Sequence, residues 1–284
     1  MVIAFSKTKG KVEPLDFHSH EYYEIYVFHG GDCYYTVGDQ IINMVPGTVL
    51  LMNGKSVHKA HVIKNENEYV RSVVHFKSNV VDGLMKKLEC SSLMAPFNRN
   101  SVSVRRVINE ENLEKIGFII ADLQGLTSLE ETDFIKKEIQ LGIIKLLMFI
   151  DRACRPIKPE DSASINTKKY YVEEIVLYLQ NNYSKEITIE KISKELGLTS
   201  SYLSRIFKDI TEHTIMEYLM YYRFTQAKYL IEISDDQTFK DIALACGFQS
   251  SSHFSRFIKE RTGMTPSMFR EAIQQKSYIS PNSR

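Results

Sequence analysis

Side chains near the N-terminus have the types and spacing of a metal or polar ligand site. His18, His20 and Glu24 lie close together, and His58 follows further along the chain. If residues 18, 20 and 24 share one strand, they face the same way, so nitrogen and oxygen atoms converge. The set predicts either a bound divalent metal ion or a group of polar side chains that hydrogen-bonds a ligand.

A second set of chemically active side chains occurs twice in the C-terminal half. The stretch GLTSSYLSRIFK, residues 197–208, returns as GFQSSSHFSRFIK, residues 247–259. As helices, both copies expose two serines, an arginine and a lysine at positions i, i+3, i+4 and i+7. Arginine can bind guanine O6 and N7, and serine can reach base edges or phosphate. The predicted DNA-binding residues are Ser201, Ser204, Arg205, Lys208, Ser252, Ser255, Arg256 and Lys259.

Short strands are expected to position the first set. Residues 1–76 contain β-branched and aromatic runs separated by glycine-rich turns, which predicts a small antiparallel barrel or jelly roll. This stretch resembles the cupin barrel: His18 and His20 match the paired histidines of its first motif, Glu24 the carboxylate, and His58 the histidine of its second motif.

The resemblance to cupins leaves two alternatives open. In enzymatic cupins these four residues bind a divalent metal, whereas in sensor domains they line a metal-free ligand pocket. Histidine is common in this region, since His61 and His75 are also present. Tyrosines nearby suit either a sugar or strand packing. The predicted effector pocket comprises His18, His20, Glu24, Tyr26, Tyr35 and His58, with Tyr22 and Tyr34 as further aromatic candidates.

Helices are expected to position the second set. Thr188 is suited to cap a helix that ends at Gly197, and Leu203, Ile206 and Phe207 give the next helix a buried face. One such motif could be a plain helical hairpin, but its repetition favours two helix-turn-helix units. A long helix, roughly 216–233, joins the units, and Thr265-Pro266 starts the last helix.

Residues 170–274 resemble the DNA-binding domain of the AraC/XylS family of transcription regulators, most closely in GFQSSSHFSRFIKERTGMTPSMFR. The resemblance implies that Ser251 also meets DNA, and that a cupin-type sensor precedes this domain. It implies double-stranded DNA, a small-molecule effector and RNA polymerase as partners, with an activator the expected type of regulator. Two departures occur: Glu212 stands where the second copy has Gly263, and His253 replaces a more usual aromatic residue.

Composition and charge limit the possible classes of protein. The chain has 284 residues and a net charge of +1, too little for a protein that coats nucleic acid, so any positive charge must be local. Its four cysteines are scattered, which favours free thiols in a reducing cytosol. The run LGIIKLLMFI at 141–150 is too short to span a bilayer. A cytoplasmic protein without membrane contact is expected.

The expected fold class is α+β with several domains. Residues 1–108 are predicted to form the barrel, 109–153 a helical pair, 154–167 a proline-containing linker, and 168–284 the DNA-binding domain. The paired helices carry apolar stripes at three- and four-residue spacing, which must pack on the barrel, on each other or on a second copy. We expect a homodimer through this pair.

Three classes of function compete at this point. The first hypothesis is a transcription regulator that responds to a small molecule, with a sugar as the suggested effector. The second is a cupin metalloenzyme of the dioxygenase or isomerase type, which leaves the repeat unexplained. The third is a protein–protein adaptor, which predicts no salt-dependent DNA binding. The repeat favours the regulator, and no catalytic residue is assigned.

Overall fold

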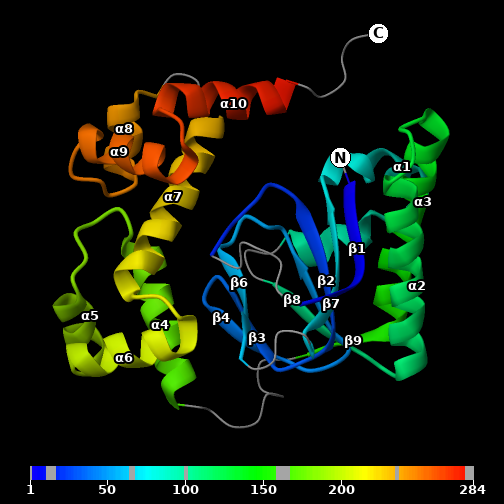
Figure 1. Ribbon diagram of the computed structural model, residues 1–284, viewed down its shortest axis with the longest axis horizontal. Coiled ribbons are helices and arrows are strands. Elements are labelled where there is room, and N and C mark those ends of the chain that lie inside the picture. The colour runs from blue at the N-terminus through cyan, green and yellow to red at the C-terminus, as the bar shows by residue number, and fades with distance from the viewer. Residues whose placement is uncertain are drawn as a thin grey trace. The chain divides into compact units, whose positions relative to one another are not determined.

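The computed structural model describes residues 2–10, 17–63, 68–98, 102–157, 167–233 and 237–278. The chain divides into two compact units, Met1–Asn166 and Thr167–Arg284, which are described separately. The first is rich in strands and the second is helical (Figure 1). This confirms the predicted α+β architecture.

Two antiparallel sheets form the first unit. The strand order is β1-β7-β2-β5-β8-β9 in the larger sheet and β4-β3-β6 in the smaller one. The strands are β1 (Val2–Lys9), β2 (Tyr23–Gly30), β3 (Cys33–Val37), β4 (Gln40–Met44), β5 (Thr48–Met52), β6 (His58–Val62), β7 (Val70–Phe76), β8 (Ser103–Val107) and β9 (Cys154–Pro156).

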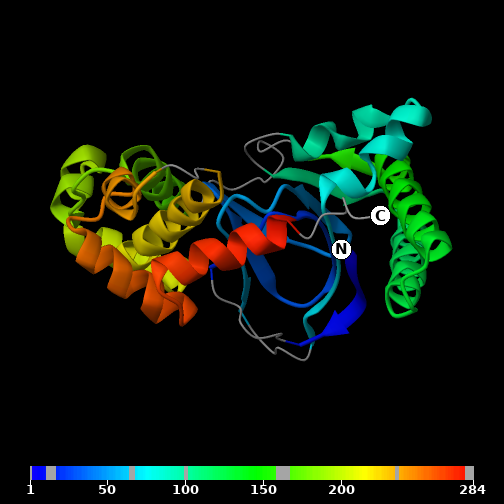
Figure 2. The same cartoon turned by 90° about the horizontal axis from the view of Figure 1, so that it is seen from above.

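The larger sheet buries both of its faces because side chains alternate along each strand. On β2, Ile25 and Val27 pack toward the helices, whereas Tyr26 and Phe28 join a second cluster with Tyr35 of β3. The two sheets therefore enclose a shared core, around which their strands curve in the view of Figure 2.

Two long helices cover the outer face of the larger sheet. Asn109 caps helix α2 (Glu110–Thr127), and Thr132 caps helix α3 (Asp133–Ala153). The side-chain oxygen of each cap residue accepts a hydrogen bond from a backbone N–H of the first turn. Their buried residues, including Ile116, Ile120 and Leu147, join the outer core cluster. The predicted helical pair is thus present, and part of its apolar stripe packs within the unit.

Short helical segments connect β7 to β8, and the sequence pattern did not predict them. They are η2 (Ser78–Val80), α1 (Asp82–Lys87) and η3 (Ser91–Phe97). Each is too short to show a helical period, so periodicity alone cannot detect it.

The predicted linker begins too early. Cys154–Pro156 form β9, which pairs with β8 at the edge of the larger sheet. The prolines suggested a linker, but an edge strand tolerates a residue without an N–H group. Residues 158–166 of the predicted linker lie outside the described residues.

Seven helices make up the described part of the second unit. They are α4 (Thr167–Asn182), α5 (Ile189–Leu196), α6 (Ser200–Thr211), α7 (Ile215–Ile233), α8 (Phe239–Ala245), α9 (Ser251–Thr262) and α10 (Pro266–Tyr278). Side chains of Thr188, Thr199, Thr238 and Ser250 each accept a hydrogen bond from the N–H three residues later. The predicted cap at Thr188, the connecting helix and the helix at Pro266 are confirmed.

All four cysteines are free and buried, as the sequence suggested. Burial raises the pKa of the Cys33, Cys154 and Cys246 thiols to about 12, so they remain protonated at neutral pH. Among the helices of the described residues, none is both long enough and apolar enough to cross a membrane.

The residues that cap the C-termini of α6 and α9 differ in type but share one backbone conformation. Glu212 after α6 and Gly263 after α9 both adopt positive φ, 62° and 72°. The missing glycine therefore does not abolish the left-handed cap, although a residue with a Cβ atom is disfavoured there. Gly247, with φ of 77°, faces a tighter constraint, since an added Cβ would lie 2.3 Å from the Tyr183 carbonyl oxygen.

We predict that Gly247→Ala destabilises the second unit more than Gly263→Ala. Both substitutions impose a left-handed conformation on alanine, which costs about 1–2 kcal/mol. At Gly263 an added Cβ meets nothing within 4 Å, whereas at Gly247 it also meets backbone and the Arg223 guanidinium. Urea unfolding of the full chain, followed by far-UV circular dichroism, compares the two variants. Equal losses would contradict the packing role of Gly247.

Candidate functional site

The first predicted DNA-binding stripe lies on α6. Leu203, Ile206 and Phe207 of this helix are fully buried and fix its orientation in the unit. The opposite face of α6 carries the predicted stripe. Ser201, Arg205 and Lys208 are exposed, and Ser204 is half-buried.

The second stripe lies on α9 and matches the first. Phe254 and Ile258 are fully buried and hold the helix, while the predicted core residue Phe257 is half-buried against the same cluster. The exposed members of the stripe are Ser251, Ser252, Arg256 and Lys259, and Ser255 is half-buried. The structure thus gives both helices one face of serine, arginine and lysine, as predicted.

The two arginines differ in what holds them. The Arg205 guanidinium lies 5.7 Å from the centroid of the Tyr202 ring, a cation–π contact. Arg256 Nε instead lies 4.0 Å from Glu260 Oε1, one helical turn away. Both contacts are exposed and therefore weak, so either arginine can leave its partner for a base or phosphate.

A buried arginine joins the two helix-turn-helix units. Arg223 of α7 donates from Nε to the Tyr183 carbonyl oxygen at 2.9 Å and from Nη2 to that of Lys185 at 2.8 Å. These carbonyls lie between α4 and α5. Gly247, in the turn of the second helix-turn-helix, approaches the same guanidinium. The contact fixes the start of the first helix-turn-helix relative to the turn of the second.

The histidine and carboxylate residues converge at one end of the barrel. Glu24 Oε2 lies 3.1 Å from His20 Nε2, 3.5 Å from His58 Nε2 and 3.1 Å from His75 Nε2. Only the His20 contact has hydrogen-bond geometry; the buried Nε2 atoms of His58 and His75 have no hydrogen-bond partner among the described residues. Three imidazole nitrogens therefore surround one carboxylate oxygen, and two of them lack a donor or acceptor.

His75 belongs to this cluster, although the sequence analysis did not assign it to the site. It lies directly opposite Glu24 in the pairing of β7 with β2. Only the strand pairing reveals this, because His75 is far from the motif in sequence. His18 lies nearer the surface, with its ring centroid 4.2 Å from that of His58.

The reason given for the convergence of His18, His20 and Glu24 was wrong. Strand β2 begins at Tyr23, so the two histidines precede it rather than share its face with Glu24. Backbone contacts position them instead: His18 forms a bridge with His58, and His20 N–H donates to the Gly54 carbonyl oxygen at 2.8 Å. The residues lie close together as predicted, but backbone contacts with His58 and Gly54, not a shared strand, bring them there.

Electrostatics keep the buried Glu24 carboxylate ionised within the cluster. Burial alone would raise the pKa of Glu24, but its contacts with His20, His58 and His75 outweigh burial and hold that pKa well below the usual range. Burial lowers the pKa of His20, and the hydrogen bond with Glu24 offsets this only in part. At neutral pH Glu24 thus carries a negative charge beside the uncharged ring of His20, which suits a cation or ligand hydroxyl groups.

Buried tyrosines fill the barrel behind the cluster. The Tyr26 hydroxyl hydrogen-bonds that of Tyr69, and the Tyr26 and Tyr35 rings meet edge-to-face at 4.8 Å. Burial raises the pKa of Tyr26 and Tyr35, so both remain protonated. Tyr26 and Tyr35 therefore lie in the core between the two sheets. Tyr22 is half-buried, with its ring centroid 6.0 Å from that of His20.

Two family models match this chain. The AraC-like ligand binding domain matches residues 15–100, and a helix-turn-helix domain matches residues 192–272. These ranges contain the histidine cluster and both recognition helices, respectively.

Similar proteins are transcription regulators. The HTH-type transcriptional activator RhaR of Mannheimia succiniciproducens is 25% identical over 269 residues, which cover 93% of this chain and 90% of that protein. The Msm operon regulatory protein of Streptococcus mutans is 32% identical over 111 residues, 39% of this chain and 40% of that protein. The melibiose operon regulatory protein of Escherichia coli K12 is 28% identical over 113 residues, 40% of this chain and 37% of that protein.

The evidence from both halves agrees. The ligand-binding model covers the barrel, the helix-turn-helix model covers the repeat, and the first relative aligns along nearly the whole length. The metalloenzyme hypothesis accounts for neither the second model nor the relatives. The chain belongs to the AraC/XylS family of DNA-binding transcription regulators, with an N-terminal ligand-binding domain.

Proposed function

We propose that this regulator activates transcription by inserting α6 and α9 into neighbouring major-groove segments of one operator. The observation that carries the proposal is the matching exposed face of the two helices, each with serine, arginine and lysine at the same spacing. Helix α7, with 19 residues, is about 28 Å long and separates the units by nearly one turn of B-DNA, about 34 Å. RNA polymerase is the expected partner, and the cytoplasm the expected location.

The effector is proposed to bind at the mouth of the barrel, with carbohydrate as its class. Glu24 and the imidazoles of His20 and His75 offer acceptors and donors for hydroxyl groups, and the Tyr22 ring can pack on a sugar face. One similar protein is named for the melibiose operon, which supports this class.

We also propose that a divalent metal ion occupies the same cluster. The Glu24 carboxylate and the ring nitrogens of His20 and His75 have ligand atoms within 4.8 Å of one another, and they are the ligand types of zinc and related ions. Ligands held at about 2.0–2.2 Å from one metal lie about 3–3.5 Å from each other. The distances around Glu24 Oε2 have this size. The ion would complete the ligand site rather than catalyse a reaction.

A dimer is proposed through α3. Phe134, Leu141 and Met148 are exposed and recur every seven residues, the spacing of a helix–helix seam. Phe118 of α2, also exposed, adds to the apolar surface. Since the rest of the stripe packs on the barrel, this seam is left for the same helix of a second copy.

For the DNA interface, we predict that Arg205→Ala and Arg256→Ala each weaken operator binding by about 1–3 kcal/mol and relax preference at one base position. Lys208→Ala should weaken binding to all DNA sequences evenly, and the salt dependence of the affinity should fall by about one released counterion. The operator is selected from a random-sequence pool, and fluorescence anisotropy across salt concentrations gives the affinities. Arg155→Ala, an exposed arginine of the first unit, is the control. Unchanged affinity in both α6 and α9 variants would contradict the groove assignment.

For the barrel, we predict that purified protein holds about one equivalent of divalent metal by elemental analysis. His75→Ala should lose most of it, because the substitution removes one of the nitrogens nearest Glu24. His61→Ala, outside the cluster, is the matched control. Calorimetric titration of melibiose, with and without chelator, then tests the sugar. Metal far below one equivalent in wild type rejects the ion, and absence of sugar binding in both states rejects melibiose as effector.

For the dimer, we predict that the protein sediments as a dimer at micromolar concentration and that Leu141→Asp shifts it to monomer. A carboxylate in the middle of the seam would be buried without a partner. Leu244→Asp replaces an equally isolated exposed leucine in the second unit and should leave the dimer intact. Sedimentation velocity distinguishes these outcomes. A wild-type monomer, or a dimeric Leu141→Asp variant, would exclude this interface.

A further inference from the structure

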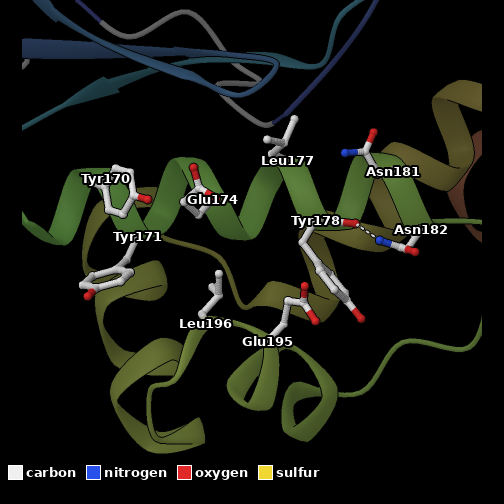
Figure 3. Close-up of a pocket in the computed structure, with 9 residues that line it drawn as sticks. All are labelled: Tyr170, Tyr171, Glu174, Leu177, Tyr178, Asn181, Asn182, Glu195 and Leu196. Atoms are coloured by element: carbon white, nitrogen blue, oxygen red, sulfur yellow. Dashed lines mark hydrogen bonds between the residues drawn. The ribbon is translucent and has the colours of Figure 1, made fainter.

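A groove outside both proposed sites runs between α4 and α5. Its volume is about 770 Å³, within the range of ligand-binding pockets. Figure 3 shows Tyr171 and Tyr178 extending from α4 toward Leu196 and Glu195 of α5. The lining residues are Tyr170, Tyr171, Glu174, Leu177, Tyr178, Asn181, Asn182, Glu195 and Leu196.

The charge of the groove is negative. Glu174 and Glu195 supply two carboxylates, and neither forms an ion pair with any described residue. The groove-lining set contains no lysine or arginine. Such a surface repels the phosphates of DNA, so the groove is not an extension of the operator interface.

The second half of the unit contains an equivalent set of tyrosines. Shifting by fifty-one positions superimposes Tyr170, Tyr171 and Tyr178 of α4 on Tyr221, Tyr222 and Tyr229 of α7. This is the same shift that relates α6 to α9. The internal repeat therefore includes the helix that precedes each helix-turn-helix.

The two copies differ in whether an arginine covers the first tyrosine. In the second copy the Arg261 guanidinium of α9 stacks on the Tyr221 ring, 3.8 Å from its centroid. The residue at the equivalent place in the first copy is Ile210, which carries no charge. Tyr170 remains 49% exposed. Helix α4 also carries Glu174 at the position where α7 has Thr225.

We propose that the α4–α5 groove binds an arginine side chain presented by a partner protein. The guanidinium stacks on Tyr170, as Arg261 does on Tyr221, while the Glu174 carboxylate accepts its N–H groups. Asn181 and Glu195 provide further acceptors along the groove for the rest of a basic segment. The second copy thus contains in one chain the contact that the first copy completes with a partner.

Arginine fits this groove better than the other ligands its lining could bind. Lysine lacks the planar fork that stacks on a ring while donating to a carboxylate. A neutral sugar would match the tyrosines and asparagines, but would leave two carboxylates without a counter-charge. The Arg261–Tyr221 contact, in which α9 covers the tyrosine equivalent to Tyr170, shows that a guanidinium stacks on this tyrosine of the repeat.

The test uses the full chain and two blocked, fluorescein-labelled tetrapeptides, Gly-Arg-Arg-Gly and Gly-Lys-Lys-Gly. Fluorescence anisotropy is expected to show at least fivefold tighter binding of the arginine peptide. Glu174→Gln and Tyr170→Leu should each weaken it at least threefold, whereas Glu271→Gln, an exposed carboxylate on α10, should not. Operator affinity of Glu174→Gln should equal that of wild type, which separates this site from DNA binding.

Three outcomes would overturn the proposal. The first is equal affinity for the two peptides, which would indicate charge attraction without stacking. The second is binding that survives both groove substitutions. The third is that the arginine peptide does not bind even at millimolar protein concentration. Circular dichroism of each variant establishes that a lost signal does not reflect unfolding.

Discussion

The arrangement of the DNA-binding unit depends on one buried guanidinium. Arg223 reaches from α7 to two carbonyl oxygens between α4 and α5, and Gly247 of the second turn lies against it. A buried arginine must have its donors satisfied, so its partners cannot move away without a large cost. The two recognition helices pack on elements that meet at this residue, and their relative placement follows from it. The two stripes keep a fixed relative position because the scaffold between them is held in this way.

A comparable constraint governs the barrel, with the opposite sign of charge. Glu24 is buried, and three imidazoles surround one of its oxygens. A carboxylate in that position persists only because its neighbours stabilise the ionised form. This charge lies at one end of the barrel, and the buried Tyr26 and Tyr35 lie behind it. The first unit therefore presents its chemistry at one end, and its helices occupy the far face of the larger sheet.

Local patterns predicted most of the second unit, because helix caps, apolar periods and the repeat are all encoded within a few residues. Thr188, Gly197 and Pro266 mark the helix boundaries found in the structure. The barrel was harder to predict. Which strands pair decides that His75 opposes Glu24, and no local pattern contains that information. The same limit explains β9: the prolines near Cys154 are compatible with both a linker and an edge strand, and only pairing with β8 distinguishes them. The contact of Arg261 with Tyr221 likewise depends on how α9 packs beside α7, which the repeated tyrosines of the sequence do not determine.

The extent of the internal repeat has a consequence for how the unit arose. Because α4 corresponds to residues 218–233, nearly all of α7, the duplicated segment is a three-helix module, α4–α5–α6 followed by α7–α8–α9, rather than a helix-turn-helix alone. On this alignment Arg223 corresponds to Val172, a fully buried apolar residue. In the second module, the same position carries the guanidinium that donates to two carbonyl oxygens in the α4–α5 connection of the first module. A tandem duplication followed by one change from apolar to basic at this position would turn two linked domains into a single DNA-reading unit.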